Sequence, residues 1–295
     1  MIYCVYSQLK ANVKTFVNNV FNKCVLNCKE PKPFICSSTK RKIGYFSKNP
    51  SKINPCYSKE ELIKAINFII DNSYVFYHDH VFRQIIGIPM GTNCAPMLAN
   101  IYLHVYEYIY LQNLVNKGDH DSIDVAKRLS QMFRYQDDCI IMNDSYIFAS
   151  HFDKIYPKEM VLKKTNVSRD KVTFLDLTIS IYKGKFIHYN YDKRRDFNFK
   201  IVNYPDLSGN IPHKSSYGTY VSQLVRFTDV NYNISKFKAE VIRLTETFIA
   251  QGFNKLELFK KYIQFCDRYL YRWSKFNMDI KQFSFYSSIF KFTIN

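Results

Sequence analysis

The chain contains, at residues 133–142, the stretch Phe-Arg-Tyr-Gln-Asp-Asp-Cys-Ile-Ile-Met. Its apolar and aromatic flanks and its polar, acidic middle predict a β-hairpin whose tight turn exposes Asp137 and Asp138. Two adjacent carboxylates repel each other unless a cation offsets their charge. Mg²⁺ (or Mn²⁺) prefers hard oxygen ligands, so the pair is a candidate metal site. A solvated Asp-Asp turn is the alternative for this motif taken alone.

A loop rich in glycine and proline lies upstream, where residues 84–96 read Gln-Ile-Ile-Gly-Ile-Pro-Met-Gly-Thr-Asn-Cys-Ala-Pro. Gly87 and Gly91 allow the backbone to approach a ligand closely, and Pro89 stiffens the loop. A helix expected from Ala95 would present free N–H groups towards phosphate. This junction suits a template base or an incoming nucleotide, although such a loop alone is a weak signal.

The hydrophobic pattern around these two motifs predicts a mixed α+β part followed by an all-helical part. Helices are expected at 7–23, after a capping box formed by Ser58 and Glu61, and at 95–111, 125–132, 217–229, 234–250 and 255–272. Besides the hairpin, strands are expected at 75–77, 81–86, 161–165, 172–182 and 186–191, with a turn at Lys183-Gly184. The basic stretch 24–57, interrupted by four prolines, is expected to be irregular.

The charge of the chain favours a polyanionic partner. Forty-two Lys and Arg against 25 Asp and Glu give a net charge of +17, which suits nucleic acid. A lysine-rich proteome encoded by AT-rich DNA would produce the same excess.

Cysteine usage and hydropathy bound the compartment. Cys24, Cys28 and Cys36 cluster, but no second pair follows at metal-ligand spacing, so free thiols in a reducing compartment are favoured over zinc. There is no signal-peptide pattern, and no apolar run reaches the roughly 20 residues that span a bilayer. We expect an intracellular protein without a membrane partner; nucleus and cytoplasm stay open.

The ordered motifs resemble those of a known family. Gly-x-Pro-x-Gly, a helix, and then Tyr-x-Asp-Asp between hydrophobic residues resembles motifs B and C of retroelement reverse transcriptases, which are RNA-directed DNA polymerases. The residues at 87–96 and 133–138 are similar in sequence to those of the Penelope-like branch and related animal reverse-transcriptase-domain proteins. The similarity covers most of residues 58–270 and runs through 87–96, 133–138, 174–177, 191–199 and 210–212.

The resemblance implies a fold and a reaction. The fold would be a right-hand polymerase palm, an antiparallel sheet with helices on one face, with partial fingers over 1–215, followed by a helical thumb-like region over 216–295. The reaction would be nucleotidyl transfer from deoxynucleoside triphosphates to a primer 3′-OH on an RNA or DNA template. Two metals about 3.5–4 Å apart would assist it.

The resemblance also assigns roles to residues. Asp137 would bind both metals with help from Asp138, and Tyr135 and Gln136 would lie at the primer end. Lys163, or Lys164, would protonate the leaving pyrophosphate, unless it belongs to an exposed basic strand. The remaining roles are a template and nucleotide pocket at Gln84, Gly87, Pro89 and Gly91, a primer grip at 174–177 (or simply core), and phosphate contacts from the thumb by Arg226, Lys236, Lys238 and Arg243 (or a solvated helix face).

The chain departs from the family at the third metal ligand, an aspartate on an earlier strand. The segment Cys4-Val-Tyr-Ser7 resembles the end of that strand, which would place the aspartate at about Met1. No acidic residue precedes Glu30, and Asp71 and Asp79 lie in the wrong part of the chain. We therefore expect an N-terminally truncated or decayed polymerase. The alternative is a catalytically dead palm-thumb remnant that binds nucleic acid.

Overall fold

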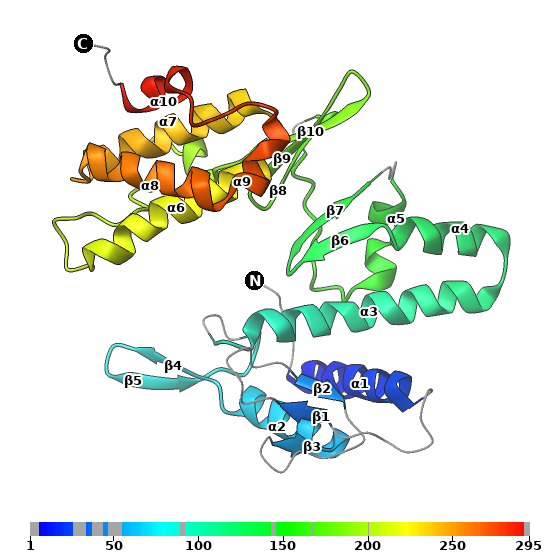
Figure 1. The fold of residues 1–295 in the computed structure, drawn as a ribbon. Coiled ribbons are helices and arrows are strands. Elements are labelled where there is room, and N and C mark those ends of the chain that lie inside the picture. Colours follow the sequence, from blue (N-terminus) through cyan, green and yellow to red (C-terminus); the bar gives the residue numbers. More distant parts are fainter. Residues whose placement is uncertain are drawn as a thin grey trace. The chain divides into compact units, whose positions relative to one another are not determined.

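The computed structural model describes residues 6–25, 34–36, 44–46, 55–88, 92–142, 146–166, 168–199 and 201–291. The chain divides into two compact units, residues 1–163 and 164–295 (Figure 1). Helices and small antiparallel sheets alternate in it, which confirms the predicted α+β class. None of the described helices is both long and apolar enough to cross a membrane.

The N-terminal unit is built around one long helix, α3 (Ala95–Lys117), which contacts α1 (Tyr6–Val25). Leu9 and Val13 of α1 and Tyr102 of α3 have almost no exposed surface and lie in one core cluster. Gly118 ends α3 in the left-handed conformation that favours glycine, with φ 74°. The helix therefore runs past the predicted end at Leu111.

α2 (Lys59–Asp71) contacts α1 and begins at the predicted capping box. The Ser58 hydroxyl accepts a hydrogen bond from the Glu61 amide at 3.2 Å, and the Glu61 carboxylate accepts one from the Ser58 amide at 2.8 Å. The hairpin of β4 (Tyr74–Tyr77) and β5 (His80–Arg83) follows, as expected, and all of its strand residues are exposed.

The stretch predicted to be irregular contains three short strands. β1 (Phe34–Cys36), β2 (Gly44–Phe46) and β3 (Cys56–Tyr57) pair antiparallel in the order β2-β1-β3. The expectation for 24–57 was wrong in this respect. Pro55, which the structure describes, directly precedes β3, where it removes no ladder hydrogen bond.

The second half of this unit holds α4 (His120–Leu129), the hairpin strands β6 (Met132–Tyr135) and β7 (Asp138–Ile141), and α5 (Ile147–Ile155). α5 was not predicted, although Phe148, Phe152 and Ile155 form a buried face at helical spacing. The strand predicted at 161–165 is wrong. Residues 161–166, all of them described, are irregular and exposed.

The C-terminal unit begins with a three-stranded meander of β8 (Lys171–Phe174), β9 (Leu177–Tyr182) and β10 (Lys185–Asn190). A turn at Leu175-Asp176 divides the single strand predicted at 172–182, whereas the Lys183-Gly184 turn is confirmed. The helical elements are η1 (Lys193–Asp196), α6 (His213–Val230), α7 (Ile234–Ala250), α8 (Lys255–Arg268), α9 (Leu270–Trp273), η2 (Ser274–Phe276) and α10 (Phe283–Phe290).

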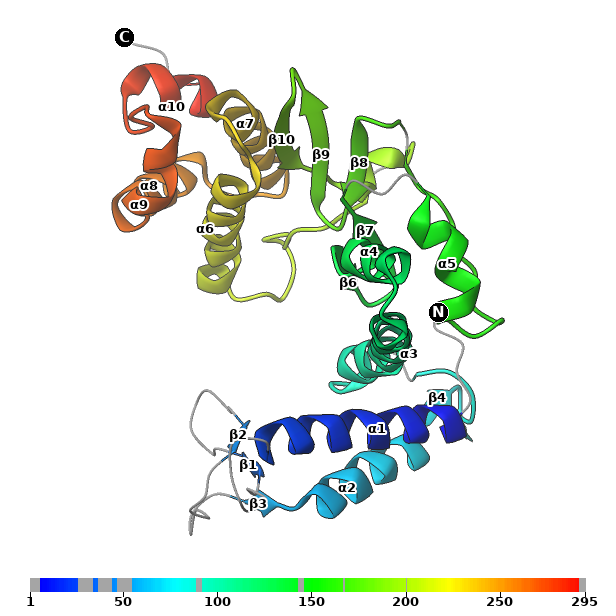
Figure 2. The same ribbon diagram turned by 90° about the vertical axis from the view of Figure 1, so that its right-hand side faces the viewer.

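The meander belongs with the helices that follow it. β10 contacts α6 and α7, and Figure 2 shows the sheet beside both helices. The His188 carbonyl accepts a hydrogen bond from the Tyr232 amide at 3.0 Å, and the Asn190 amide donates to the Asn231 side chain at 3.2 Å. The division at 163/164 therefore lies earlier than the boundary at 215/216 expected from the sequence.

Candidate functional site

The hairpin tip has the geometry expected for residues 133–142. Tyr135 pairs with Asp138, which leaves Gln136 and Asp137 as a two-residue turn. Gln136 has φ 54°, a left-handed conformation that is strained for any residue except glycine. Asp137 lies in the turn, Asp138 begins β7, and both side chains are exposed. Neither carboxylate has a hydrogen-bond or ion-pair partner within the described part of the chain.

Arg134 fixes the hairpin to α3. Its Nε and Nη2 donate to the two carboxylate oxygens of Glu107 at 2.6 and 3.2 Å. Its Nη1 donates to Asn100 Oδ1 at 2.9 Å and to the Gln136 carbonyl at 3.1 Å. The side chains of Arg134 and Glu107 are only 9% and 13% exposed. A bidentate ion pair this well buried holds β6 in one position against the helix.

Asn100 connects the turn to the start of α3. Its Oδ1 also accepts a hydrogen bond from the Gln136 amide at 3.3 Å. Asn100 lies less than two helical turns after Ala95, where α3 begins. The N-terminal end of the helix that follows the glycine-rich loop therefore lies beside the carboxylate-bearing turn.

Glu107 also ties the chain after α5 to this centre. The Tyr156 hydroxyl donates to Glu107 Oε1 at 2.5 Å. Burial, together with the charge of Glu107, raises the pKa of Tyr156 far above its ordinary value, so the hydroxyl remains a donor. Burial first, and Glu107 second, raise the pKa of the Cys139 thiol to about 11. Next to α3 the hairpin therefore contacts, among the described residues, only paired or uncharged groups, namely the Arg134–Glu107 ion pair, the Tyr156 hydroxyl and the Cys139 thiol. Its tip carries two carboxylates.

The loop residues predicted to bind nucleotide are placed only in part. Gly87 has φ 82°, which requires glycine, and it is buried. Gln84 donates from its side chain to the Ile86 carbonyl at 2.9 Å, so this amide folds back on its own loop. Pro89 and Gly91 lie outside the described residues. Their predicted roles stay predictions.

The two adjacent aspartates suit a hard divalent cation. Magnesium in proteins is commonly held by one or two carboxylates together with substrate phosphates and water. Among the described residues, no group of three or more His, Cys, Asp or Glu side chains could hold a metal ion. The third carboxylate of a complete two-metal site is thus not supplied by the part of the chain that the structure describes.

The structure around Lys163 and around residues 174–177 differs from the one predicted. Lys163 is exposed and lies in the irregular segment 161–166, so the strand on which its role depended does not exist. Residues 174–177 form the β8–β9 turn, where Leu175 is exposed and Asp176 pairs with Arg226 at 2.9 Å. Their role as a primer grip, or as core, stays a prediction.

The cations expected to track phosphates from the thumb already have partners inside the C-terminal unit. Arg226 pairs with Asp176, and Arg243 Nη1 lies 3.0 Å from Glu240 Oε1. The ammonium groups of Lys236 and Lys238 lie 4.6 and 4.9 Å from the ring centroids of Tyr189 and Phe285. A phosphate group bound by these four side chains would have to compete with the contacts that they already make.

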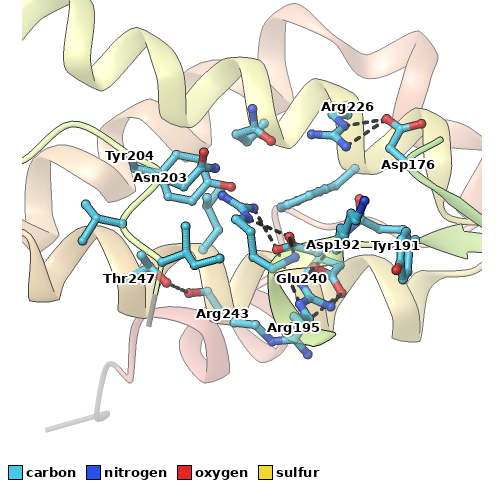
Figure 3. Close-up of a pocket in the computed structure, with 18 of the residues that line it drawn as sticks. Asp176, Tyr191, Asp192, Arg195, Asn203, Tyr204, Arg226, Glu240, Arg243 and Thr247 are labelled. Carbon is cyan, nitrogen blue, oxygen red and sulfur yellow. Dashed lines mark hydrogen bonds and ion pairs between the residues drawn. The ribbon is translucent and has the colours of Figure 1, made fainter. Parts of the chain in front are cut away.

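Sequence reasoning missed a pocket of about 520 Å³ in the C-terminal unit. Figure 3 shows its polar walls, which come from the β8–β9 turn, η1, α6 and α7. The run Asp192-Lys-Arg-Arg-Asp196, directly after a strand, was the available signal, because its three basic residues outnumber the two acidic residues beside them. No role could be predicted from this run, because Glu240, which pairs with Arg195, lies 45 residues further along the chain.

Comparison of the chain with protein-family models, with curated proteins and with solved structures finds no significant match. In the described part of the chain, charged side chains that could bind a ligand gather in two places. One is the hairpin tip with Asp137 and Asp138 in the N-terminal unit, and the other is the arginine-rich pocket in the C-terminal unit.

Proposed function

We propose that this chain is the palm-and-thumb part of an RNA-directed DNA polymerase that extends a primer 3′-OH on an RNA or DNA template. One observation carries the proposal: Asn100 and Arg134 hold the exposed Asp137-Asp138 turn beside the N-terminal end of α3. A rigid carboxylate pair next to a helix start is a suitable arrangement for a metal-bound triphosphate. The motif order and the basic charge of the chain support the same function.

In this function Asp137 and Asp138 would hold Mg²⁺ (or Mn²⁺). The metal would lower the pKa of the attacking hydroxyl and neutralise charge on the pyrophosphate that leaves. The residues around it act by position. Arg134 and Glu107 fix the position of the turn on α3, and the positive end of the α3 dipole would face phosphate. Tyr135, which is exposed beside the turn, would lie against the primer end.

A second function, non-catalytic binding of nucleic acid, is favoured by one specific observation. The described residues supply no third acidic ligand near the turn. Without a bridging ligand, much of the transition-state charge stabilisation of a two-metal site is lost. The net charge of +17 would still attract a duplex.

Primer extension separates these functions. The full chain would be given an oligo(dT) primer on a poly(rA) template with dTTP and either Mg²⁺ or Mn²⁺. Polymerase function predicts incorporation that is lost in Asp137→Ala and kept in Asp121→Asn, a control that removes a fully exposed carboxylate elsewhere in the same unit. Incorporation that survives Asp137→Ala would exclude the hairpin as the metal site.

A binding measurement completes the test. Both functions require affinity for the template-primer duplex that falls steeply between about 50 and 200 mM salt, because phosphate contacts release counterions. Steep salt dependence without incorporation in either metal would support the non-catalytic function. A flat salt response together with no incorporation would contradict both.

A further inference from the structure

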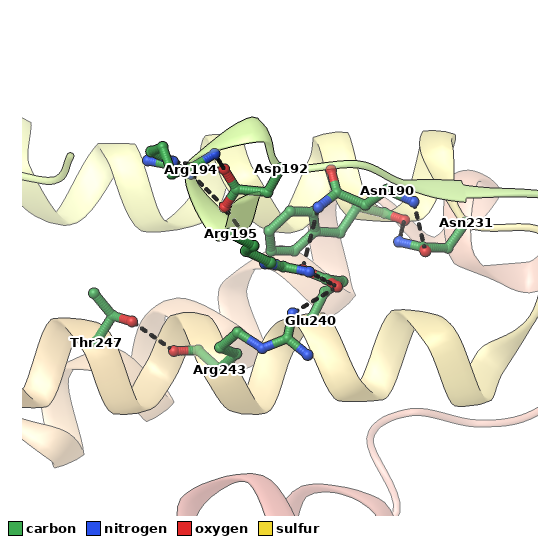
Figure 4. Close-up of polar contacts among 9 residues, drawn as sticks. Asn190, Asp192, Arg194, Arg195, Asn231, Glu240, Arg243 and Thr247 are labelled. Atoms are coloured by element: carbon green, nitrogen blue, oxygen red, sulfur yellow. Dashed lines mark hydrogen bonds and ion pairs between the residues drawn. The ribbon is translucent and has the colours of Figure 1, made fainter. Parts of the chain in front are cut away.

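The arginine-rich pocket lies wholly within the C-terminal unit, whereas the hairpin belongs to the N-terminal unit. Its centre is Glu240, which is buried and accepts hydrogen bonds from three side chains (Figure 4). Arg195 donates to both carboxylate oxygens at 3.0 and 2.5 Å, and Arg243 donates to Oε1 at 3.0 Å. Asn190 donates to Oε2 at 3.2 Å. Two guanidinium groups thus share one carboxylate.

The charges around Glu240 do not balance. Asp192 binds Arg194 through two hydrogen bonds of 2.6 and 2.8 Å and lies 3.6 Å from Arg195. Although burial raises the pKa of Asp192, its bonds to Arg194 hold that pKa below the ordinary value, so the group is ionised. Three arginines therefore meet two carboxylates. The uncompensated positive charge falls on Arg243, whose side chain is 50% exposed and lines the pocket.

Hydrogen-bond acceptors without donors occur in the same walls. Among the described residues, Asn190 Oδ1, Gln223 Oε1 and Gln251 Oε1 are buried and have no hydrogen-bond partner. They belong to β10, α6 and the end of α7, and all three residues line the pocket. Asn190 and Gln251 are more than nine-tenths buried. Unpaired buried acceptors are costly, so the protein's own donors do not fully satisfy the polar groups of this wall.

One wall of the pocket is apolar. Phe199 is 61% exposed and lines the opening together with Ile201 and Tyr204. An exposed aromatic ring beside an arginine cluster can pack against a planar group while the arginines bind an anion. The volume of about 520 Å³ is within the usual range for sites that bind small ligands.

We propose that this pocket binds one phosphorylated nucleoside, with its phosphate at Arg243 and Arg195 and its base against Phe199. The same chemistry is offered by a free nucleoside monophosphate and by the 5′-phosphorylated end of a nucleic-acid strand. The site is independent of the metal-binding hairpin and does not depend on polymerase function.

The test measures binding of adenosine 5′-monophosphate to the full chain by calorimetry in the presence of EDTA, which removes metal-dependent binding at the hairpin. We expect saturable binding, with adenosine and inorganic phosphate each at least about tenfold weaker, because each lacks one half of the contacts. Arg243→Gln should weaken binding about tenfold. Arg268→Gln, which removes an exposed charge outside the pocket, should not.

Further measurements distinguish the source of the ligand. Competition by a 5′-phosphorylated oligonucleotide, but not by its 5′-hydroxyl counterpart, would identify a strand end; competition by neither would identify a free nucleotide. Asp137→Ala should leave binding unchanged, so failure of the polymerase function would not affect this result. Should Arg243→Gln unfold, Phe199→Ala replaces it and is expected to weaken both the nucleotide and adenosine.

Three results would overturn the proposal. The first is no saturable binding of either the nucleotide or the 5′-phosphorylated oligonucleotide. The second is equal affinity for the nucleotide and for inorganic phosphate. The third is unchanged affinity in a folded Arg243→Gln or Phe199→Ala variant.

Discussion

Arg134 is the residue that fixes the Asp137-Asp138 turn to helix α3. Its guanidinium is buried, and every described partner is on α3 or on the turn itself. Arg134→Met should lower the free energy of unfolding of the N-terminal unit by about 3 kcal/mol, because it leaves Glu107 as a buried charge without its cation. Urea unfolding followed by circular dichroism would measure this loss.

Trp273 provides an internal control for that measurement. It is the only tryptophan of the chain and belongs to the C-terminal unit. The urea midpoint of the transition that its fluorescence reports should therefore be the same in the variant as in the unchanged chain. The double variant Glu107→Gln, Arg134→Met should recover part of the loss, since no unpaired charge remains. If the double variant lost the full sum of the two single effects, Arg134 and Glu107 would not be coupled as the distances indicate.

At this scale the sequence was informative where the signal is local. Asp137 and Asp138 were placed at the hairpin tip because turn residues and their flanks are neighbours in the chain. Glu107, Asn100 and Glu240 gave no signal, since a polar residue on a helix is most often solvated. Only the fold shows that Asn100 meets a turn 36 residues later and that Glu240 meets Arg195 across 45 residues.

Four hairpins in the described part of the chain share one feature, a two-residue turn that begins with a non-glycine residue of positive φ. These residues are His78 and Lys183 with φ 50°, and Gln136 and Leu175 with φ 54°. Such a conformation costs of order 1 kcal/mol in a residue with a side chain. In the β6–β7 hairpin, hydrogen bonds of the Gln136 backbone to Asn100 and Arg134 offset that cost.

The turn geometry predicts opposite effects of two substitutions at Gln136. Gln136→Gly should raise the free energy of unfolding of the N-terminal unit by about 0.5 kcal/mol, because glycine adopts positive φ without strain. Gln136→Val should lower it by about 1–2 kcal/mol, since a β-branched side chain is poorly tolerated there. Both changes are measured by urea unfolding followed by circular dichroism.

A glutamine next to the same hairpin is the control for the turn. Gln131 is exposed, precedes β6 and does not have positive φ, so Gln131→Gly should be neutral or slightly destabilising. A stabilisation equal to that of Gln136→Gly would show that the effect is not specific to the turn.

Elements were predicted well where their boundaries are marked in the sequence. The capping box at Ser58, the turn at Lys183-Gly184 and helix α7 are examples. α5 was missed, because a short apolar run satisfies helix and strand periods about equally well. The strand expected at 161–165 is a separate error, in a segment that is irregular. Packing against α3 and α4 decides in favour of the helix at 147–155.

On the scale of the whole molecule, the described residues form two hydrophobic cores that share no residue. One contains Tyr102 and the other Tyr220, and every pocket contact of the arginine cluster falls in the second unit. The sequence placed the boundary at 215/216 because the helical pattern begins there. It could not show that β10 contacts α6 and α7 and is hydrogen-bonded to the segment between them, since that contact is a property of the tertiary structure.

Two fragments separate these boundaries. Residues 164–295 should fold alone with one cooperative transition, because they contain the complete second core and the sheet that packs on it. Residues 216–295 keep the buried apolar residues but lose Arg195 and Asn190, so that Glu240 is left with Arg243 as its single described partner. This fragment should be at least about 3 kcal/mol less stable, as expected when a buried carboxylate loses its main cation.

The comparison is made by urea unfolding of both fragments, followed by Trp273 fluorescence. Glu240→Leu in the shorter fragment is the matched control: it removes the buried charge and should restore part of the stability, whereas in 164–295 it should destabilise by leaving Arg195 without Glu240. Equal stability of the two fragments would instead favour the boundary at 215/216. It would also mean that the contacts between η1 and α7, on which the pocket depends, contribute little to the fold.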